Sequence, residues 1–262
     1  MNELVAGIDL CDEYTQVNCN DEEKTWTFPT VLCRHKVSGT WSVGEDAYAQ
    51  TLRGEGSLTD KLVKLVLKEG TATLEGIRYT AVELLERFLE RVLWQVQKNL
   101  GTEAGFQELV FTVRSLDERL TEALYSCGEK LGVDRARIRI IGHTEGLIYY
   151  MLSQKKEIWS GNVGLFDLSE QELRYYEMKV QRGLKQNAVL AEFERIEESF
   201  SLDILETPSG AKLGDKILCT CAERLMQRKL YSAVFLMGKG FEKRDWAEDF
   251  MKLLCTKRRV YM

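Results

Sequence analysis

The sequence predicts an α/β protein of two lobes, each built around a mixed β-sheet. Short apolar runs typical of buried strands alternate with longer stretches whose apolar residues recur every three or four positions, as on one face of a helix. One pattern also occurs twice: a strand ending in aspartate, an acidic turn and a returning strand. Its aspartates, Asp9 and Asp167, are 158 positions apart (167 minus 9), which favours an internal duplication. We place the lobes at residues 1–157 and 158–262, meeting near Gln154–Gly161, with the second lobe shortened.

The composition excludes several classes of protein. The 262 residues carry 36 basic and 41 acidic side chains and a net charge of −5, which argues against a nucleic-acid-binding protein, because such proteins need a basic face. No apolar run approaches the roughly 18 residues of a membrane span, and the N-terminus lacks the basic segment of a signal peptide. The 7 scattered cysteines contain no CxxC pair and indicate reduced thiols. We therefore expect a cytoplasmic protein.

The first half of the chain opens with a predicted hairpin around the turn Cys11–Glu13. The clearest helix follows Thr80, which forms a capping-box sequence with Glu83; apolar residues then recur to Leu100, and Gly101 can end the helix. The other elements expected here are strands at 25–33, 39–44, 108–113 and 137–141, and helices from 44, within 57–68, over 116–131 and over 143–153.

The second half continues the alternation of strands and helices. We expect strands at 162–168, 172–178, 189–196 and 231–237, a helix from 214, a helix over 244–255 and a last strand at 258–262. Because no helix follows to cover that last strand, we expect the chain to be cut short at its C-terminal end.

Six short motifs occur in a characteristic order: Gly7–Leu10, Phe28–Val31, Val43–Ala47, Phe111–Val113, Phe166–Leu168 and Val234–Gly240. In this order they resemble the actin-like ATPases, most of all the bacterial branch of that superfamily and the ATPase domains of heat-shock chaperones. The resemblance spans nearly the whole chain. It implies two ribonuclease-H-like domains that face each other across a nucleotide cleft.

The resemblance also implies where a nucleotide, ATP or ADP with Mg²⁺, would bind. The first phosphate loop corresponds to Asp9, Leu10, Cys11, Asp12 and Glu13, and the second to Asp167, Leu168, Ser169 and Glu170. The turn that contacts adenosine corresponds to Gly238, Lys239 and Gly240. The helix connecting the domains carries His143 and Glu145, and Lys61 falls near a phosphate-contacting lysine of the chaperones.

Both phosphate loops depart from the family's pattern. The family has Asp-Leu/Ile-Gly-Thr/Ser-Thr/Ser in the first loop and Asp-Leu/Ile-Gly-Gly-Gly-Thr in the second. Glycines let phosphate oxygens approach backbone N–H groups, and hydroxyls donate to them. Here both loops lack the glycines and carry carboxylates instead. At 4 Å two like charges repel by about 4 kcal/mol at an effective dielectric constant of 20, so ATP binding is disfavoured.

We therefore expect a degenerate actin-like domain that has lost ATP hydrolysis, holds no nucleotide, and serves as an interaction or scaffold module through a protein partner or self-association. The alternative is an ATP-binding actin-like or chaperone-like ATPase with divergent phosphate loops. A sugar kinase of the same superfamily is a third reading, for which we place no catalytic carboxylate or sugar-binding cluster.

The carboxylates also have structural readings. Asp9 and Asp167 are suited either to hold Mg²⁺ through water or to cap their own turns. The acidic turn residues Asp12, Glu13, Glu170 and Glu172 are expected to be solvated rather than to form a cation site. The turn at Gly238–Gly240 fits an adenine contact and simple packing at a helix start equally well.

The reactive side chains in these motifs are expected to be structural. We expect His143 to cap a helix or lie at the surface, rather than to act as a base. We expect no nucleophilic role for Cys11, because neighbouring acids raise the pKa of a thiol. With His35 and His143 as the 2 histidines, a Cys/His zinc site is not expected.

Overall fold

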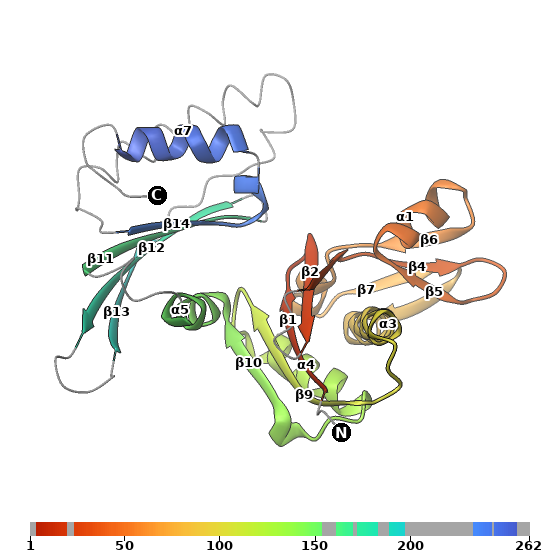
Figure 1. Ribbon diagram of the computed structural model, residues 1–262. Coiled ribbons are helices and arrows are strands. Elements are labelled where there is room, and N and C mark those ends of the chain that lie inside the picture. Colours follow the sequence, from red (N-terminus) through yellow and green to blue (C-terminus); the bar gives the residue numbers. More distant parts are fainter. Residues whose placement is uncertain are drawn as a thin grey trace. The chain divides into compact units, whose positions relative to one another are not determined.

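The fold is described by a computed structural model that places residues 4–19, 24–153, 161–169, 172–182, 189–196, 233–242 and 244–255. The chain divides into two units, Met1–Met151 and Leu152–Met262, and both mix strands with helices (Figure 1), which confirms the predicted α/β class. Several expected features lie outside the described residues: the boundary between 157 and 158, the helix from 214, the strand at 258–262, and Glu170.

A five-stranded sheet forms the centre of the first unit. Its strands are β1 (Leu4–Leu10), β2 (Tyr14–Cys19), β3 (Thr25–Pro29), β9 (Phe106–Val113) and β10 (Ile138–Gly142). The first three form an antiparallel meander, and β9 and β10 add in parallel on the other side of β1, giving the order β10-β9-β1-β2-β3. The carboxyl ends of β1, β9 and β10 therefore lie at the same edge of the sheet.

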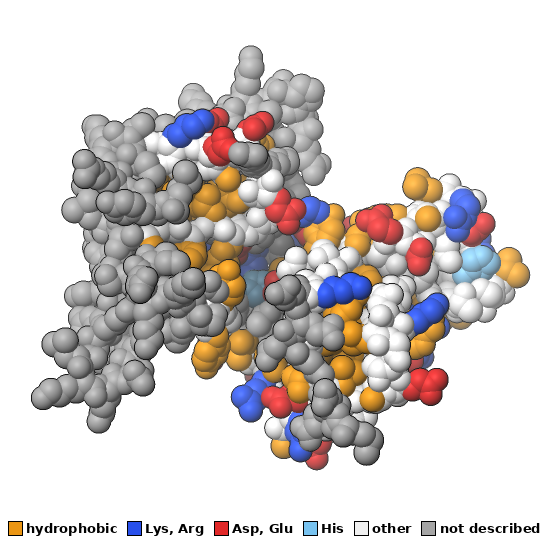
Figure 2. Space-filling view, in the orientation of Figure 1, with side chains coloured by type: hydrophobic (Ala, Val, Ile, Leu, Met, Phe, Trp, Pro, Cys, Tyr) orange, Lys and Arg blue, Asp and Glu red, His pale blue; other side chains and the backbone are white. Residues whose placement is uncertain are grey.

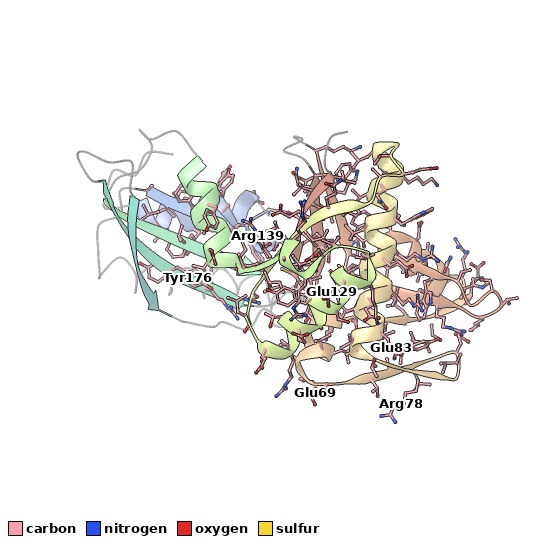
Figure 3. The ribbon with its side chains drawn as sticks, turned by 90° about the horizontal axis from the view of Figure 1, so that it is seen from below. Glu69, Arg78, Glu83, Glu129, Arg139 and Tyr176 are labelled. Carbon is pink, nitrogen blue, oxygen red and sulfur yellow. The ribbon has the colours of Figure 1, made fainter. Side chains whose placement is uncertain are left out.

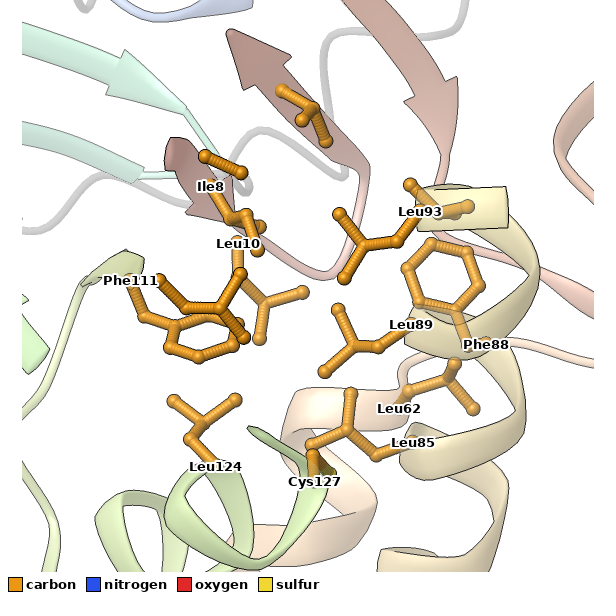
Figure 4. Packing of buried hydrophobic residues seen from close by; sticks show 14 of the residues in the cluster. Ile8, Leu10, Leu62, Leu85, Phe88, Leu89, Leu93, Phe111, Leu124 and Cys127 are labelled. Atoms are coloured by element: carbon orange, nitrogen blue, oxygen red, sulfur yellow. The ribbon is translucent and has the colours of Figure 1, made fainter. Parts of the chain in front are cut away.

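Three helices share one hydrophobic core with this sheet: α2 (Leu62–Leu67), α3 (Ala81–Leu100) and α4 (Glu118–Lys130). Side chains alternate along β1, so Ile8 and Leu10 are buried in this core while Asp9 points to the other side. Figure 4 shows Ile8 and Leu10 in the same cluster as residues of all three helices, among them Leu62, Phe88 and Leu124. This core fixes the end of β1 and the turn that follows.

The helix predicted most clearly, α3, begins and ends as expected. The Thr80 hydroxyl accepts a hydrogen bond from the backbone N–H of Glu83 (3.3 Å), and the Glu83 carboxylate accepts one from the N–H of Thr80 (2.8 Å). Figure 3 labels Glu83 at this start of the helix. At the other end Gly101 adopts the left-handed conformation, with φ 65°. The capping box and the glycine stop are both confirmed.

The segment between β3 and β9 adds two small sheets. The first has the order β5-β4-β6 and lies beside α1; its bounds are β4 (Leu32–His35), β5 (Trp41–Val43), α1 (Gly44–Leu52) and β6 (Gly56–Thr59). The helix expected within 57–68 is therefore wrong for its first part, because residues 56–59 pair with β4 and the helix begins at Leu62. The second sheet is the hairpin of β7 (Thr71–Leu74) and β8 (Ile77–Thr80), which was not predicted.

The second unit contains a four-stranded sheet with the order β13-β12-β11-β14. Its strands are β11 (Gly161–Ser169), β12 (Glu172–Arg182), β13 (Val189–Ile196) and β14 (Ala233–Met237). The first three again form an antiparallel meander, and β14 pairs in parallel with β11. Helix α7 (Arg244–Cys255) lies along this sheet (Figure 1), where the ring of Phe250 packs edge-on against Phe166 at 4.9 Å. All five elements had been predicted.

The described surface mixes charges of both signs. On the face shown in Figure 2, Lys and Arg side chains are interspersed with Asp and Glu and do not gather in one basic patch. Within the described ranges, no helix combines the length and the apolar character needed to cross a membrane.

Candidate functional site

The candidate site of the first unit lies at the edge where three parallel strands end. Asp9 is the second-last residue of β1 and pairs in register with Thr112 of β9. His143 follows directly after β10 and is the first residue of α5 (His143–Ser153). Parallel register brings the ends of β1, β9 and β10 together, so residues separated by more than 100 positions meet here. The carboxyl edge of parallel strands is where α/β proteins commonly place their ligand sites.

The side chains of Asp9 and His143 are in direct contact. Nε2 of His143 lies 2.7 Å from Oδ1 of Asp9, and the hydroxyl of Thr112 donates a hydrogen bond to the same oxygen (2.9 Å). Removal from water raises the pKa of the Asp9 carboxyl, but the hydrogen bond and charge of His143, with the bond from Thr112, lower it more. The net pKa lies below the usual carboxyl value, so Asp9 is ionised at neutral pH. His143 is thus neither a simple helix cap nor a surface residue.

Cys11 is the first residue of the hairpin turn, two positions after Asp9. Its sulfur lies 3.8 Å from Nε2 of His143, and its backbone N–H donates to the carbonyl of Tyr14 (3.1 Å), which closes the turn. Asp9, Cys11 and His143 therefore converge: one donor atom from each lies within 4.8 Å of the other two. Leu10, between them in sequence, is fully buried in the core on the opposite side of β1.

Asp12 is buried, which corrects the expectation of a solvated turn residue. Its side chain is only 5% exposed, and Oδ1 accepts hydrogen bonds from the backbone N–H groups of Val63 (2.8 Å) and Lys64 (3.2 Å). These are the first turn of α2, whose own N-cap residue, Lys61, supplies no side-chain cap. Asp12 therefore caps a helix about 50 residues away in sequence. Glu13 is exposed, as expected.

Replacing Asp12 with alanine should destabilise the first unit by about 1–2 kcal/mol, because two buried N–H groups of α2 lose their acceptor. Asp12→Asn is the matched control: it keeps an acceptor oxygen of the same shape and should recover most of the loss. Urea unfolding followed by circular dichroism measures both changes. Equal stability of Asp12→Ala and the wild type would contradict the capping role.

Two further residues implied by the resemblance lie near this edge in sequence but do not join the cluster. Lys61 is exposed and adopts the left-handed conformation (φ 53°) just before α2. Glu145 is exposed on α5 and accepts a hydrogen bond from the Tyr149 hydroxyl (3.3 Å). A phosphate contact by Lys61 stays a prediction.

In the second unit, the end of β11 meets the glycine turn after β14. Asp167 is 5% exposed and pairs in register with Met237, one residue before Gly238. Gly238 has φ 84°, and a Cβ atom built on it would lie 2.5 Å from the carbonyl oxygen of Leu168 and 2.6 Å from Oδ1 of Asp167. Gly240 approaches Leu168 just as closely. The two motifs are thus brought together, which requires glycine at 238.

The remaining residues of these two motifs are placed less fully. Lys239 is exposed and begins a short 3₁₀ turn, Lys239–Glu242. Ser169 is the last residue of β11. The expectation that Asp9 and Asp167 hold Mg²⁺ through water stays a prediction.

A comparison with protein families identifies one match: a family described as "Family of unknown function (DUF5716) C-terminal" matches residues 13–262. The chain belongs to this family. No curated protein matches it. Because the description of the DUF5716 family carries no activity or ligand, its function has to be argued from the site.

Sequence reasoning singled out each residue of the first-unit cluster but did not join them. Asp9 and Cys11 share a face of the chain because they are two positions apart in an extended segment. His143 follows a strand that proves to be parallel to β1. These two signals together could have predicted the convergence of Asp9, Cys11 and His143 in this DUF5716 chain. Thr112, which orients Asp9, lies in the motif Phe111–Val113, but nothing in the sequence assigned it a role at the site.

Proposed function

We propose that this chain is a degenerate actin-like domain that does not hydrolyse ATP and serves as an interaction or scaffold module. Two ribonuclease-H-like lobes are part of this proposal. It is supported by the strand order that both sheets share, an antiparallel meander followed by a parallel strand beside the first. The repeated Asp9 and Asp167 at the ends of the two first strands, β1 and β11, support an internal duplication.

The observation that carries the loss of hydrolysis is that the groups of the first turn are engaged within the chain. The N–H of Cys11 bonds Tyr14, and the carboxylate of Asp12 bonds the start of α2. The carboxylate of Asp9 pairs with His143. A phosphate at this turn would approach the carboxylates of Asp12 and Glu13, where the family's loop has glycine and hydroxyl residues. Each pair of like charges 4 Å apart repels by roughly 4 kcal/mol at an effective dielectric constant of 20.

One observation favours a second candidate, an ATP-binding ATPase with divergent phosphate loops. The end of β11 with Asp167 lies directly beside the turn at Gly238, and the approach is close enough to exclude a side chain. The resemblance implies a phosphate loop and an adenosine turn at these positions. Their juxtaposition is compatible with a nucleotide site in the second unit.

Titration of the full chain with Mg-ATP separates the two candidates. We expect no binding heat in calorimetry and no rise in melting temperature at about 1 mM nucleotide, with or without EDTA. A ligand at 100 times its dissociation constant would stabilise the native state by about 2.7 kcal/mol, which is readily measured. Mg-dependent binding near 1 μM, about −8 kcal/mol, would contradict the proposal. ATP hydrolysis by the wild type that is lost in Asp9→Asn and Asp167→Asn would then establish the ATPase alternative.

A further inference from the structure

The cluster of Asp9, Cys11 and His143 has a geometry that neither nucleotide hypothesis uses. The sulfur of Cys11 and Oδ1 of Asp9 both face Nε2 of His143, at 3.8 Å and 2.7 Å. One oxygen, one sulfur and one nitrogen thus surround a common point, each within 4.8 Å of the others.

A catalytic cysteine triad requires a different arrangement. In such a triad the thiol contacts one ring nitrogen of the histidine, and the carboxylate holds the proton on the other. Here the thiol and the carboxylate approach the same nitrogen. The two groups compete for one position of the ring, so His143 is not arranged to pass a proton from Cys11 towards Asp9.

We propose that Asp9, Cys11 and His143 bind a divalent transition-metal ion of the zinc class. In a tetrahedral zinc site with bonds of about 2.0–2.3 Å, neighbouring nitrogen and oxygen ligands lie ~3.3 Å apart, and nitrogen and sulfur ~3.6 Å apart. The nitrogen–oxygen separation of 2.7 Å would have to grow by about 0.6 Å and the nitrogen–sulfur separation of 3.8 Å to shrink by about 0.2 Å, shifts within reach of small side-chain rotations. A bound ion would lie between Nε2 of His143, Oδ1 of Asp9 and the sulfur of Cys11, and each of the three atoms would then contact the ion.

The chemistry of the three donors selects the metal. A thiolate ligand favours zinc and similar soft ions over Mg²⁺, which takes oxygen ligands. An ionised Asp9, a thiolate at Cys11 and a neutral His143 together balance the two positive charges of the ion. Three protein ligands leave the fourth tetrahedral position for water or another ligand. The Asp9 side chain is 45% exposed, so that position can be reached from solvent.

The ligands are held by regular elements and by a further hydrogen bond. Asp9 lies in β1, between β2 and β9, and Cys11 follows in the tight turn. The hydroxyl of Thr112 donates to the Asp9 carboxylate and orients it. Bonds of this kind around a metal site commonly change affinity by 10–100-fold. The site depends on β1, β9 and α5 of the first unit and is independent of whether the chain binds nucleotide.

Titration of the full metal-free chain with Zn²⁺, without nucleotide, tests the site. We expect one ion bound with an affinity that falls at least ~100-fold in Cys11→Ser and in His143→Gln, and by about 10–100-fold in Thr112→Val. His35→Gln is the matched control, because His35 is the other of the 2 histidines and lies in the first unit away from the cluster; it should leave the affinity unchanged. Circular dichroism checks that each variant is folded.

Substitution with Co²⁺ gives a second readout that stability alone does not produce. The wild type and His35→Gln should show visible bands of tetrahedral cobalt and a thiolate charge-transfer band. Cys11→Ser should lose the charge-transfer band, and His143→Gln should lose tetrahedral cobalt. The proposal is overturned if Zn²⁺ does not bind at ~100 μM. It is also overturned if Cys11→Ser and His143→Gln both retain the wild-type affinity and cobalt spectrum, because other residues would then hold the metal.

Discussion

Phe88→Ala is expected to lower the free energy of unfolding of the first unit by about 3–5 kcal/mol. The Phe88 side chain is fully buried in α3, within the cluster that joins three helices to the central sheet (Figure 4). Removing the ring loses its apolar burial and leaves a cavity that its neighbours fill only in part. Because domains are stable by only about 5–15 kcal/mol, this change removes a large fraction of the total. Urea unfolding followed by circular dichroism measures the loss.

Trp94→Ala is the matched control for this prediction. It also exchanges an aromatic residue of α3 for alanine, but the Trp94 side chain is 50% exposed and touches Lys98 of the same helix. Alanine has a higher helix propensity than either aromatic residue, so this contribution favours both variants to a similar extent. We expect a change within about 1 kcal/mol. If both variants lose the same stability, the core described around Phe88 is wrong.

Gly238→Ala should destabilise the second unit by about 2–4 kcal/mol. The new Cβ atom would approach the carbonyl oxygen of Leu168 to 2.5 Å, and the backbone at 238 has φ 84°, which alanine adopts with strain. The obstacle is partly backbone, so it does not move aside as a flexible side chain would. We expect β14 and the turn to shift away from β11, which hydrogen exchange of the amides in β11 and β14 would detect as lost protection.

Gly132→Ala separates the two causes of this effect. Gly132 has nearly the same φ, 85°, but no atom lies within 4 Å of a Cβ built on it. Its substitution should therefore cost only the conformational strain, about 1 kcal/mol. A Gly238→Ala variant no worse than Gly132→Ala would show that the turn does not lie against β11.

Local signals in the sequence were enough to predict much of the fold. The limits of α3 follow from Thr80, Glu83 and Gly101, each of which acts within one turn of its own helix. The strands of the second unit and α7 follow from apolar runs and helical periodicity. These signals work because capping and amphipathic burial are decided by residues close together in the chain.

The elements that were missed depend on less typical turns or on distant partners. The hairpin of β7 and β8 turns at Glu75-Gly76, where both residues have positive φ, 48° and 75°. Asparagine or aspartate before glycine is the usual signal for that turn, and glutamate is not. Strand β6 exists because residues 56–59 pair with residues of β4 that lie 21 to 27 positions earlier, and local propensity does not reveal that pairing.

The candidate site was predictable only in its parts. Asp12 was predicted to be a solvated turn residue. The N–H groups of α2 that donate to its carboxylate lie 51 and 52 positions away, so the local sequence does not reveal them. The pairing of His143 with Asp9 depends on the parallel order of β1, β9 and β10, which single-strand patterns do not specify. The sequence identified Asp9, Cys11 and His143 as candidate residues, but only the order of the strands in the sheet shows that they lie close together.

The parallel pairing of β1 with β9 also bears on how the chain folds. Asp9 and its partner Thr112 are 103 positions apart, so this pairing closes a long loop and is a slow, high-contact-order step. At about 5–20 residues per second, a ribosome needs roughly 5–20 s to make β9 after β1 has emerged. During that time the edge of β1 that β9 later covers, together with the buried residues Ile8 and Leu10, is open to other strands. Newly made chains are therefore most prone to aggregate before β9 is complete.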